Sequence, residues 1–180
     1  NLTGNSVTKF SNVRYGNVLN SRGSLIPKFF EISKNTNVKK FFPVTDKRMT
    51  RFWITLDETV RFVLQSFSLM VGGETFVPKI PSVRIIDIAK AINPKIPIKI
   101  IGLRPGEKLH EILCPLDSSH ATIEFKKYFL IRPEIVFFNK KNNYSINKLG
   151  EKGKVKKEFE YNSLNNPNFL SINQIKKYFG

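Results

Sequence analysis

Residues 55–79 read TLDETVRFVLQSFSLMVGGETFVPK and combine the pattern of a helix with that of a strand. Apolar side chains recur there at helical intervals, at Leu56, Val60, Val63, Leu64 and Phe67. Thr55 and Glu58 fit a capping box at the start of this helix, and the glycines at 72–73 end it. The next residues, Glu74–Lys79, predict a short buried strand. The region therefore indicates a helix that leads directly into a strand.

Further strands and helices flank this region on both sides. Phe10–Val18 is rich in β-forming residues and predicts a strand, as does Ile98–Leu103. Leu25–Ser33 predicts a helix, and Val83–Ile92 predicts a helix with one apolar face. Because helices and strands alternate, the sequence predicts an α/β fold with at least part of a parallel sheet.

The second half of the chain gives weaker signals. Glu107–Leu113 consists of helix-forming residues after a tight turn and predicts a short helix. Tyr128–Phe138 is an apolar segment interrupted by a proline, and Leu170–Phe179 predicts a last amphipathic helix. Since a polar, Lys-rich stretch follows the apolar segment, we predict a main part over 1–138 and a C-terminal extension over 139–180.

The composition bounds the class of protein. The chain has 180 residues, of which 41% are hydrophobic, so it is long enough for one compact domain with a real core. Its one cysteine, Cys114, excludes an intramolecular disulfide framework and a multi-cysteine zinc site. No stretch approaches the roughly 20 apolar residues of a membrane span, and no export signal opens the sequence. We therefore expect a cytoplasmic protein without a membrane partner.

The formal net charge of +16 raises the question of nucleic-acid binding. The cations are 22 Lys and 8 Arg, spread from Lys9 to Lys177. They lack the interleaving of Arg and aromatic residues that a base-stacking surface needs. Non-specific attraction to polyanions is compatible with such a charge. Nucleic-acid binding is therefore the weakest of the functional interpretations.

Six short strings carry a resemblance to a known family. They are RYGNV at Arg14–Val18, SRGS at Ser21–Ser24, TDKRMTRFWITLDE at Thr45–Glu58, GGETFVPKIPS at Gly72–Ser82, LRPGEKLHE at Leu103–Glu111 and EFEY at Glu158–Tyr161. In this order they resemble the inverting UDP-N-acetylglucosamine 4,6-dehydratases of pseudaminic acid biosynthesis, which are extended short-chain dehydrogenase/reductases. The resemblance covers most of the chain. It implies the C-terminal part of a Rossmann-type fold, interwoven with a small substrate-binding subdomain.

The same resemblance marks what this sequence lacks. None of its ten glycines forms the GxGxxG or GxxGxxG loop that cradles the cofactor pyrophosphate in such folds. The family's catalytic Tyr-x-x-x-Lys pair would lie before Asn1, so no catalytic residue is assigned here. Tyr144 and Lys148 have this spacing, but they lie in an Asn-rich stretch and are interpreted as a chance match. The family's cofactor, NADP, is expected to be bound mainly by an absent N-terminal half.

The resemblance assigns five residues to a UDP-sugar: Asn17, Leu25, Thr45, Arg104 and Glu107. Asn17 ends the first predicted strand, which is where open α/β sheets bind ligands. Arg104 would offer a fork of donors to the phosphates, and Glu107 would accept hydrogen bonds from ribose hydroxyls. Alternatives remain open: a surface salt bridge from Arg104 to Glu107 or Glu111, a core role for Leu25 and a turn role for Thr45.

The turn after this strand is assigned by the resemblance to the cofactor, through Val18, Leu19, Asn20, Ser21 and Arg22. Asn20 stands where the family usually has glycine, and the turn is expected to survive because Asn tolerates left-handed backbone angles. Arg51 could face the ligand, whereas Trp53 beside it is expected in the core. Neither histidine has metal-ligand spacing with a cysteine or carboxylate, so no metal site is expected. Cys114 is interpreted as a buried apolar residue.

The function implied by the resemblance is an NADP-dependent dehydration of the sugar. Oxidation at C4 acidifies the proton at C5, so that water can leave across C5 and C6. Without the cofactor loop and the catalytic pair, the isolated chain is expected to be inactive. It would need the missing N-terminal half or a complementing chain, and would form a homo-oligomer when complete. The alternatives are a UDP-sugar-binding module without turnover and a basic nucleic-acid-binding remnant.

Overall fold

The computed structural model describes residues 8–35, 41–135 and 142–179. Its contacts divide the chain into two compact units, each assembled from three separate segments. Unit 1 comprises Asn1–Tyr15, Leu56–Lys79 and Ile112–Asn162, and unit 2 comprises Gly16–Thr55, Ile80–Glu111 and Ser163–Gly180. The boundary predicted between 1–138 and 139–180 falls within 136–141, which lies outside the described residues, and it stays a prediction.

Unit 1 is built around a mixed sheet of five strands. In spatial order these are β1 (Asn12–Val13), β5 (Thr75–Pro78), β10 (Tyr128–Ile131), β9 (Thr122–Glu124) and β11 (Lys154–Val155). β1 and β5 are parallel, and the other neighbours are antiparallel. A smaller sheet pairs β8 (Ile112–Cys114) with β12 (Tyr161–Asn162), and a 3-10 helix, η1, spans Leu116–Ala121.

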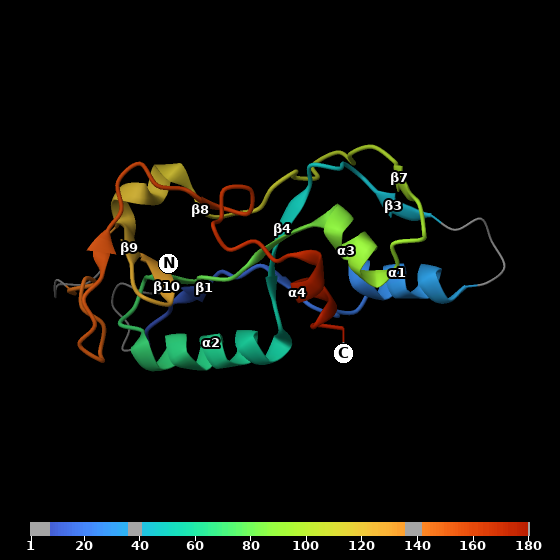
Figure 1. The fold of residues 1–180 in the computed structure, drawn as a ribbon. Coiled ribbons are helices and arrows are strands. Elements are labelled where there is room, and N and C mark those ends of the chain that lie inside the picture. Colours follow the sequence, from blue (N-terminus) through green and yellow to red (C-terminus); the bar gives the residue numbers. More distant parts are fainter. Residues whose placement is uncertain (1–7, 36–40, 136–141, 180) are drawn as a thin grey trace. The chain divides into compact units, whose positions relative to one another are not determined.

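The helix of unit 1, α2 (Leu56–Leu69), packs against the sheet (Figure 1). The shared core consists of Phe62, Leu69, Phe76, Ile123, Phe125, Tyr128 and Leu130. After the helix, Gly72 and Gly73 have φ values of 118° and 86°, which residues with a side chain rarely adopt. The buried carboxylate of Glu74 accepts the amide protons of Val71 and Gly72 at 2.6 and 2.7 Å. These bonds fix the turn from α2 into β5.

The described residues of unit 2 form two small sheets and three helices. One sheet has the order β2 (Asn17–Val18), β4 (Thr50–Ile54) and β6 (Ser82–Arg84), with β2 parallel and β6 antiparallel to β4. The other pairs β3 (Phe42–Val44) in parallel with β7 (Ile98–Ile100). The helices are α1 (Leu25–Lys34), α3 (Ile85–Ile92) and α4 (Ile172–Lys176). α3 contacts both other helices, so its apolar residues lie at the centre of the core.

Most of the elements predicted from sequence are confirmed. α1, α2, α3, α4, β5 and β7 all lie within or next to the segments predicted for them. α3 begins at Ile85, two residues later than predicted, because Ser82–Arg84 pairs with β4 as a strand. Within the described residues, no helix has the length and hydrophobicity needed to cross a bilayer.

The prediction of a single strand over Phe10–Val18 is wrong. The segment forms β1 and β2, which pair in different units. Between them Gly16 lies against β4 so closely that a Cβ there would be 2.5 Å from the Cβ of Phe52. β-propensity marks both halves as extended, but it cannot show that they join different sheets.

The prediction of a helix over Glu107–Leu113 is also wrong: these residues form bends and then the start of β8, and tertiary hydrogen bonds hold the backbone in this non-helical path. The carbonyl of Leu109 accepts the amide proton of Thr50 at 3.0 Å, and the amide of Glu111 donates to Ser163 Oγ at 2.9 Å. Such contacts override local helix propensity. Of the apolar segment predicted at Tyr128–Phe138, β10 takes the first four residues, and 136–138 lies outside the described residues.

Candidate functional site

A cavity of about 340 Å³ lies in unit 2. Its walls come from β2, the start of α1, the end of β3, the middle of β4, the first turn of α3 and the segment after β7. Six of the residues predicted for the site line it: Asn17, Val18, Leu25, Thr45, Arg104 and Glu107. The structure therefore brings together all five residues predicted for the substrate and one predicted for the cofactor.

The N-terminus of α1 opens onto this cavity. Ser24, Leu25 and Ile26 line it, and Ser24 is the N-cap residue of the helix. The side chain of Ser24 makes no capping bond, and its buried Oγ has no hydrogen-bond partner among the described residues. The first amides of a helix lack intrahelical partners and carry a partial positive charge. This end of α1 is thus suited to an anion that accepts hydrogen bonds.

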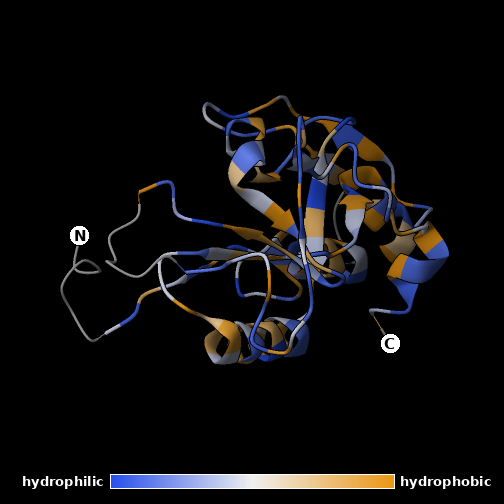
Figure 2. Ribbon diagram, turned by 90° about the vertical axis from the view of Figure 1, so that its left-hand side faces the viewer, coloured by the Kyte–Doolittle hydropathy of each residue, from blue (hydrophilic) through white to orange (hydrophobic). Residues whose placement is uncertain are grey.

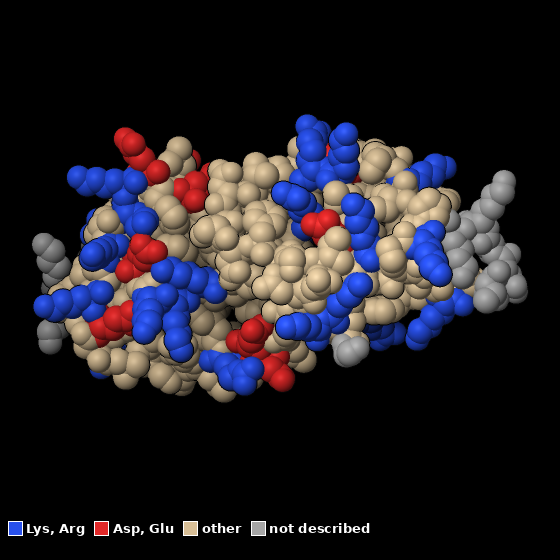
Figure 3. All heavy atoms as spheres, viewed as in Figure 1, with Lys and Arg blue, Asp and Glu red and all other residues tan. Residues whose placement is uncertain are grey.

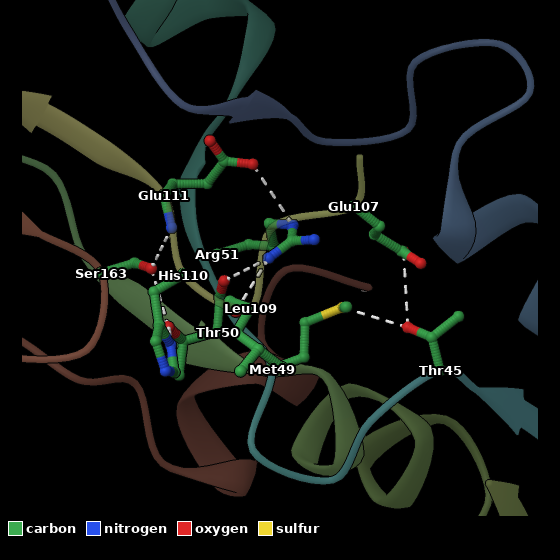
Figure 4. Close-up of polar contacts among 9 residues, drawn as sticks. All are labelled: Thr45, Met49, Thr50, Arg51, Glu107, Leu109, His110, Glu111 and Ser163. Atoms are coloured by element: carbon green, nitrogen blue, oxygen red, sulfur yellow. Dashed lines mark hydrogen bonds and ion pairs between the residues drawn. The ribbon is translucent and has the colours of Figure 1, made fainter. Parts of the chain in front are cut away.

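Arg104 and Glu107 are held together by the turn between them. The Glu107 amide donates to the Arg104 carbonyl at 3.0 Å, and the Arg104 amide donates to Glu107 Oε2 at 3.2 Å. Gly106 allows this turn with a φ of 77°. Thr45 Oγ1 donates to Glu107 Oε1 at 3.3 Å, which ties the end of β3 to the same carboxylate (Figure 4).

The alternative of a salt bridge from the Arg104 guanidinium is contradicted. Within the part of the chain that the structure describes, this group pairs with neither Glu107 nor Glu111. Glu111 instead approaches Arg51, at 3.4 Å from its Nε. The exposed guanidinium of Arg104 therefore remains available at the cavity wall.

Arg51 is the second arginine of the cavity and is much less exposed, with 14% of its side chain accessible. Its Nη1 donates to the carbonyls of Thr50 and Leu109 at 2.7 and 3.1 Å (Figure 4). Burial lowers the pKa of Arg51, while the carboxylates of Glu111 and Glu107 oppose this shift. The group nevertheless stays cationic, since arginine does not deprotonate in proteins. An anionic ligand would therefore offset part of the free energy that this cation loses through desolvation.

Beside Arg51 lies a polar network, which consists of Thr50, His110, Ser163 and Glu111 (Figure 4). Thr50 Oγ1 lies 2.8 Å from His110 Nδ1 and 2.7 Å from Ser163 Oγ. Ser163 Oγ also accepts the amide proton of Glu111, the residue that pairs with Arg51. Burial and the charges of Arg51 and Arg48 lower the pKa of His110 against the pull of Asp46, so its ring is neutral near pH 7. Sequence reasoning missed Thr50 and Ser163, and no sequence signal links residues 113 positions apart.

The side chains of the cavity favour a negatively charged, hydroxyl-rich ligand. Its cations are Lys28, Arg51 and Arg104, against the single carboxylate of Glu107, so its net formal charge is 3 − 1 = +2. Asn17 and Thr45 add an amide and a hydroxyl. Leu25 lines the cavity and also packs against the core, so its position is compatible with both of the roles predicted for it, and the contact with substrate stays a prediction.

The turn predicted for the cofactor has the backbone that was expected. Asn20 has a φ of 57°, in the left-handed region that Asn tolerates. Val18 lines the cavity, whereas the side chain of Leu19 is buried in the core of unit 2. Asn20, Ser21 and Arg22 are exposed and lie outside the cavity wall. Their amide, hydroxyl and guanidinium groups fit the polar margin of a dinucleotide, and this turn supplies no glycine-rich cradle for the pyrophosphate.

The surroundings of three further residues explain them structurally. Cys114 is fully buried, as predicted, and burial raises the pKa of its thiol to about 12 against a small opposing effect of Arg14. Tyr144 donates to the Gly72 carbonyl at 2.8 Å, and Lys148 Nζ donates to the Ser68 carbonyl at 3.0 Å. Burial raises the pKa of Tyr144, opposite to the shift that a catalytic base needs.

Metal ligation finds no support in the part of the chain that the structure describes. No group of three or more His, Cys, Asp or Glu side chains there is placed to hold an ion.

Comparisons with known proteins agree with these features. A profile of the family described as "Polysaccharide biosynthesis protein" matches residues 1–133. The UDP-N-acetylglucosamine 4,6-dehydratase (inverting) of Campylobacter jejuni serotype O:2 is 52% identical over 176 residues, which are 97% of this chain and 52% of that protein. The protein of the same name from C. jejuni serotype O:23/36 is 50% identical over the same shares of both chains.

A solved structure gives the same result for the fold. The X-ray structure of Pen from Bacillus thuringiensis superimposes with a TM-score of 0.76 and 31% sequence identity, over 98% of this chain and 50% of that one. This likeness confirms the predicted fold class, an α/β fragment of Rossmann type. The chain thus spans about half the length of these relatives.

Proposed function

The chain belongs to the polysaccharide biosynthesis protein family, and from this premise we propose that it is the UDP-sugar-binding part of a C5-inverting UDP-N-acetylglucosamine 4,6-dehydratase. The observation that carries the proposal is one cavity that combines two arginines, a helix N-terminus and short polar side chains. Its setting would be nucleotide-sugar metabolism for surface polysaccharides or flagellin glycans. We place it in the cytoplasm, where a reducing milieu keeps the thiol of Cys114 free.

The diphosphate of a UDP-sugar is the group that this cavity suits best. Arg104 presents a planar fork of donors that matches phosphate oxygens, and its exposed position lets it close onto a ligand. Arg51 adds a cation whose position is fixed by two backbone carbonyls. The free amides at the start of α1 and the unpaired Oγ of Ser24 can donate to the remaining oxygens.

The uncharged parts of the ligand would meet the other polar residues of the wall. Glu107 would accept hydrogen bonds from ribose hydroxyls, with Thr45 holding one carboxylate oxygen in place. Asn17, the first residue of β2, would donate to and accept from the sugar. Leu25 would pack against an apolar face of the ligand.

NADP would be bound mainly by the half of the family fold that this chain does not span. The turn from Val18 to Arg22 would run along its edge, with exposed amide, hydroxyl and guanidinium groups. When bound, NADP would supply the hydride-transfer chemistry of the reaction. Because neither the glycine-rich loop nor a helical Tyr-x-x-x-Lys pair lies in this sequence, we propose that the chain alone binds without turnover. The complete enzyme would be a homo-oligomer.

Nucleic-acid binding has weaker support. On the face shown in Figure 3, Lys and Arg are spread over many elements with Asp and Glu among them. Four of the lysines and arginines stack on phenylalanine rings of their own chain, at 4.8–5.7 Å from the ring centres. These rings are therefore already covered by a cation, which leaves less aromatic surface for bases.

Isothermal titration calorimetry of the purified chain with UDP tests the proposal. We expect binding in the millimolar range or tighter, with a Kd raised by about tenfold or more in Arg104→Ala, since bonds to a charged group are strong. Arg84→Ala is the matched control, because Arg84 is an exposed arginine of the same unit outside the cavity wall. No binding of UDP, or an equal loss in Arg84→Ala, would contradict the proposal.

A further inference from the structure

α2 has one face that is buried against the sheet and a second, apolar face that the described residues leave exposed. The first face is buried against the sheet of unit 1 and consists of Thr59, Phe62, Ser66 and Leu69. The second is the stripe noted in the sequence, and its members Leu56, Val60, Val63, Leu64 and Phe67 have exposed fractions of 62, 50, 39, 62 and 73%. In Figure 2 the helices, α2 among them, carry both hydrophobic (orange) and hydrophilic (blue) residues.

The exposed stripe is as regular as a buried one. At the helical rotation per residue, its five side chains fall within an arc of about 100°. The remaining side of the helix carries the polar residues Asp57, Glu58, Arg61, Gln65 and Ser68. A helix on the surface of a globular protein needs one apolar stripe, which faces its core. The second stripe of α2 is therefore suited to burial against another polypeptide.

The sheet beside this helix also has an open edge. Among the described residues, β1 pairs with β5 alone. The amides of Asn12 and Arg14 donate towards β5 at 2.9 Å, so the N–H and C=O of Val13 point to the opposite side. A hollow of about 440 Å³ lies along this edge, lined by residues 12–15 and Thr75. Next to it, the buried Oγ of Ser11 has no partner within the described ranges.

We propose that the exposed stripe of α2 and the open edge of β1 form a docking surface for the half of the family fold that this chain does not span. The occupant adds a parallel strand beside β1 and covers the stripe with apolar side chains. The partner would thus complete unit 1, whereas the cavity of the proposed function is built entirely from unit 2.

The size of the relatives argues for this occupant. The matched region is 52% of the Campylobacter protein and 50% of Pen, so nearly half of each lies outside it. β1 and β5 are parallel, and α2 lies between them in the chain, as in a crossover unit of an α/β sheet. Parallel sheets are covered on both faces and grow by further strands and helices of this kind. A second copy related by a two-fold axis would instead pair β1 with β1 in antiparallel orientation.

Co-expression tests the proposal directly. The full chain, carrying an affinity tag, is produced together with the half of the C. jejuni serotype O:2 relative that it does not match. We expect both polypeptides to be recovered as a 1:1 complex, measured by size-exclusion chromatography with light scattering. If the relative's half is not retained, or if the chain associates only with itself, the proposal is overturned.

A pair of matched variants locates the contact. Leu64→Lys/Phe67→Lys places two charges in the exposed stripe, and Gln65→Lys/Ser68→Lys places two on the polar side of the same helix. We expect the first variant to raise the Kd of the complex by about tenfold or more and the second to leave it unchanged. Equal affinities of the two variants would exclude α2 as the contact.

Hydrogen exchange of the unmutated chain supplies a readout that does not depend on how a variant folds. Binding of the relative's half should slow the exchange of the Val13 amide and leave the amides of β11, at the opposite edge of the sheet, unchanged. An unchanged Val13 amide in the complex would refute docking at β1. UDP binding by the free chain is measured separately and does not depend on docking of the relative's half. Failure of the docking proposal is therefore distinguishable from failure of the proposed function.

Discussion

Arg51 and Arg104 serve the same cavity in different ways. Arg51 is anchored on the carbonyls of Thr50 and Leu109 and by the carboxylate of Glu111, so its guanidinium is placed before a ligand arrives. Arg104 lies on a turn whose backbone is fixed by Glu107 while its side chain stays exposed. One preorganised and one adjustable cation would together hold a diphosphate as it enters.

The buried thiol of Cys114 should react only slowly with thiol reagents. Because burial raises its pKa to about 12, the reactive thiolate is scarce near pH 8 in the folded chain. We expect labelling by a maleimide or disulfide reagent at about pH 8 to be at least about a hundredfold slower in the native chain than in urea. Fast labelling of the native chain would show that the site opens.

Among the elements, one carboxylate in the sheet of unit 1 forms ion pairs with lysines that follow two other strands. Glu124 in β9 lies 2.8 Å from Nζ of Lys79, which follows β5, and 2.9 Å from Nζ of Lys156, which follows β11. Burial alone would raise the pKa of Glu124, but its bonds to the two lysines outweigh this and lower it. The carboxylate therefore links three strands of the sheet through charge.

The pH dependence of this link has a definite sign. A lowered pKa in the folded state stabilises the protein above the ordinary pKa of glutamate, 4.5, and the effect is lost as the pH falls through the lowered value. Glu124→Gln should lower the urea midpoint at neutral pH, and its difference from the wild type should shrink in acid. Glu134→Gln, which removes an exposed carboxylate near His120, is the control. A difference in urea midpoint between Glu124→Gln and the wild type that persists in acid would show that the stabilisation by Glu124 is not ionic.

Elements with a strong local pattern could be predicted, and those set by distant contacts could not. The helical spacing of apolar residues predicts α2, and the glycines after it predict where it ends. Both signals are local in the sequence. The non-helical backbone around Leu109 depends on hydrogen bonds to Thr50 and Ser163, which are far away in sequence. Local helix propensity therefore gave the wrong prediction there. The same limit applies to the site: motifs indicated Arg104 and Asn17, whereas the network beside Arg51 exists only in three dimensions.

For the whole molecule, the interleaving of the two units explains why no linker stands out in the sequence. Each unit draws on three segments, so the chain passes between them several times. The cavity belongs to unit 2, and the uncovered helix face and sheet edge belong to unit 1. If both proposals hold, this division would separate ligand binding from completion of the fold, in a chain that spans about half the length of its relatives.

An NMR titration of the isotope-labelled chain with UDP-N-acetylglucosamine and NADP+ shows whether the cavity of unit 2 binds the UDP-sugar without converting it. It reads the protein amides and the sugar protons in one sample. We expect shifts of the amides of Leu25, Ile26 and Glu107, which line the cavity, with sugar signals that stay unchanged over time. Formation of a 4-keto sugar would show that the chain is catalytic by itself. Shifts confined to surface lysines, with none at the cavity, would show that the UDP-sugar does not bind there.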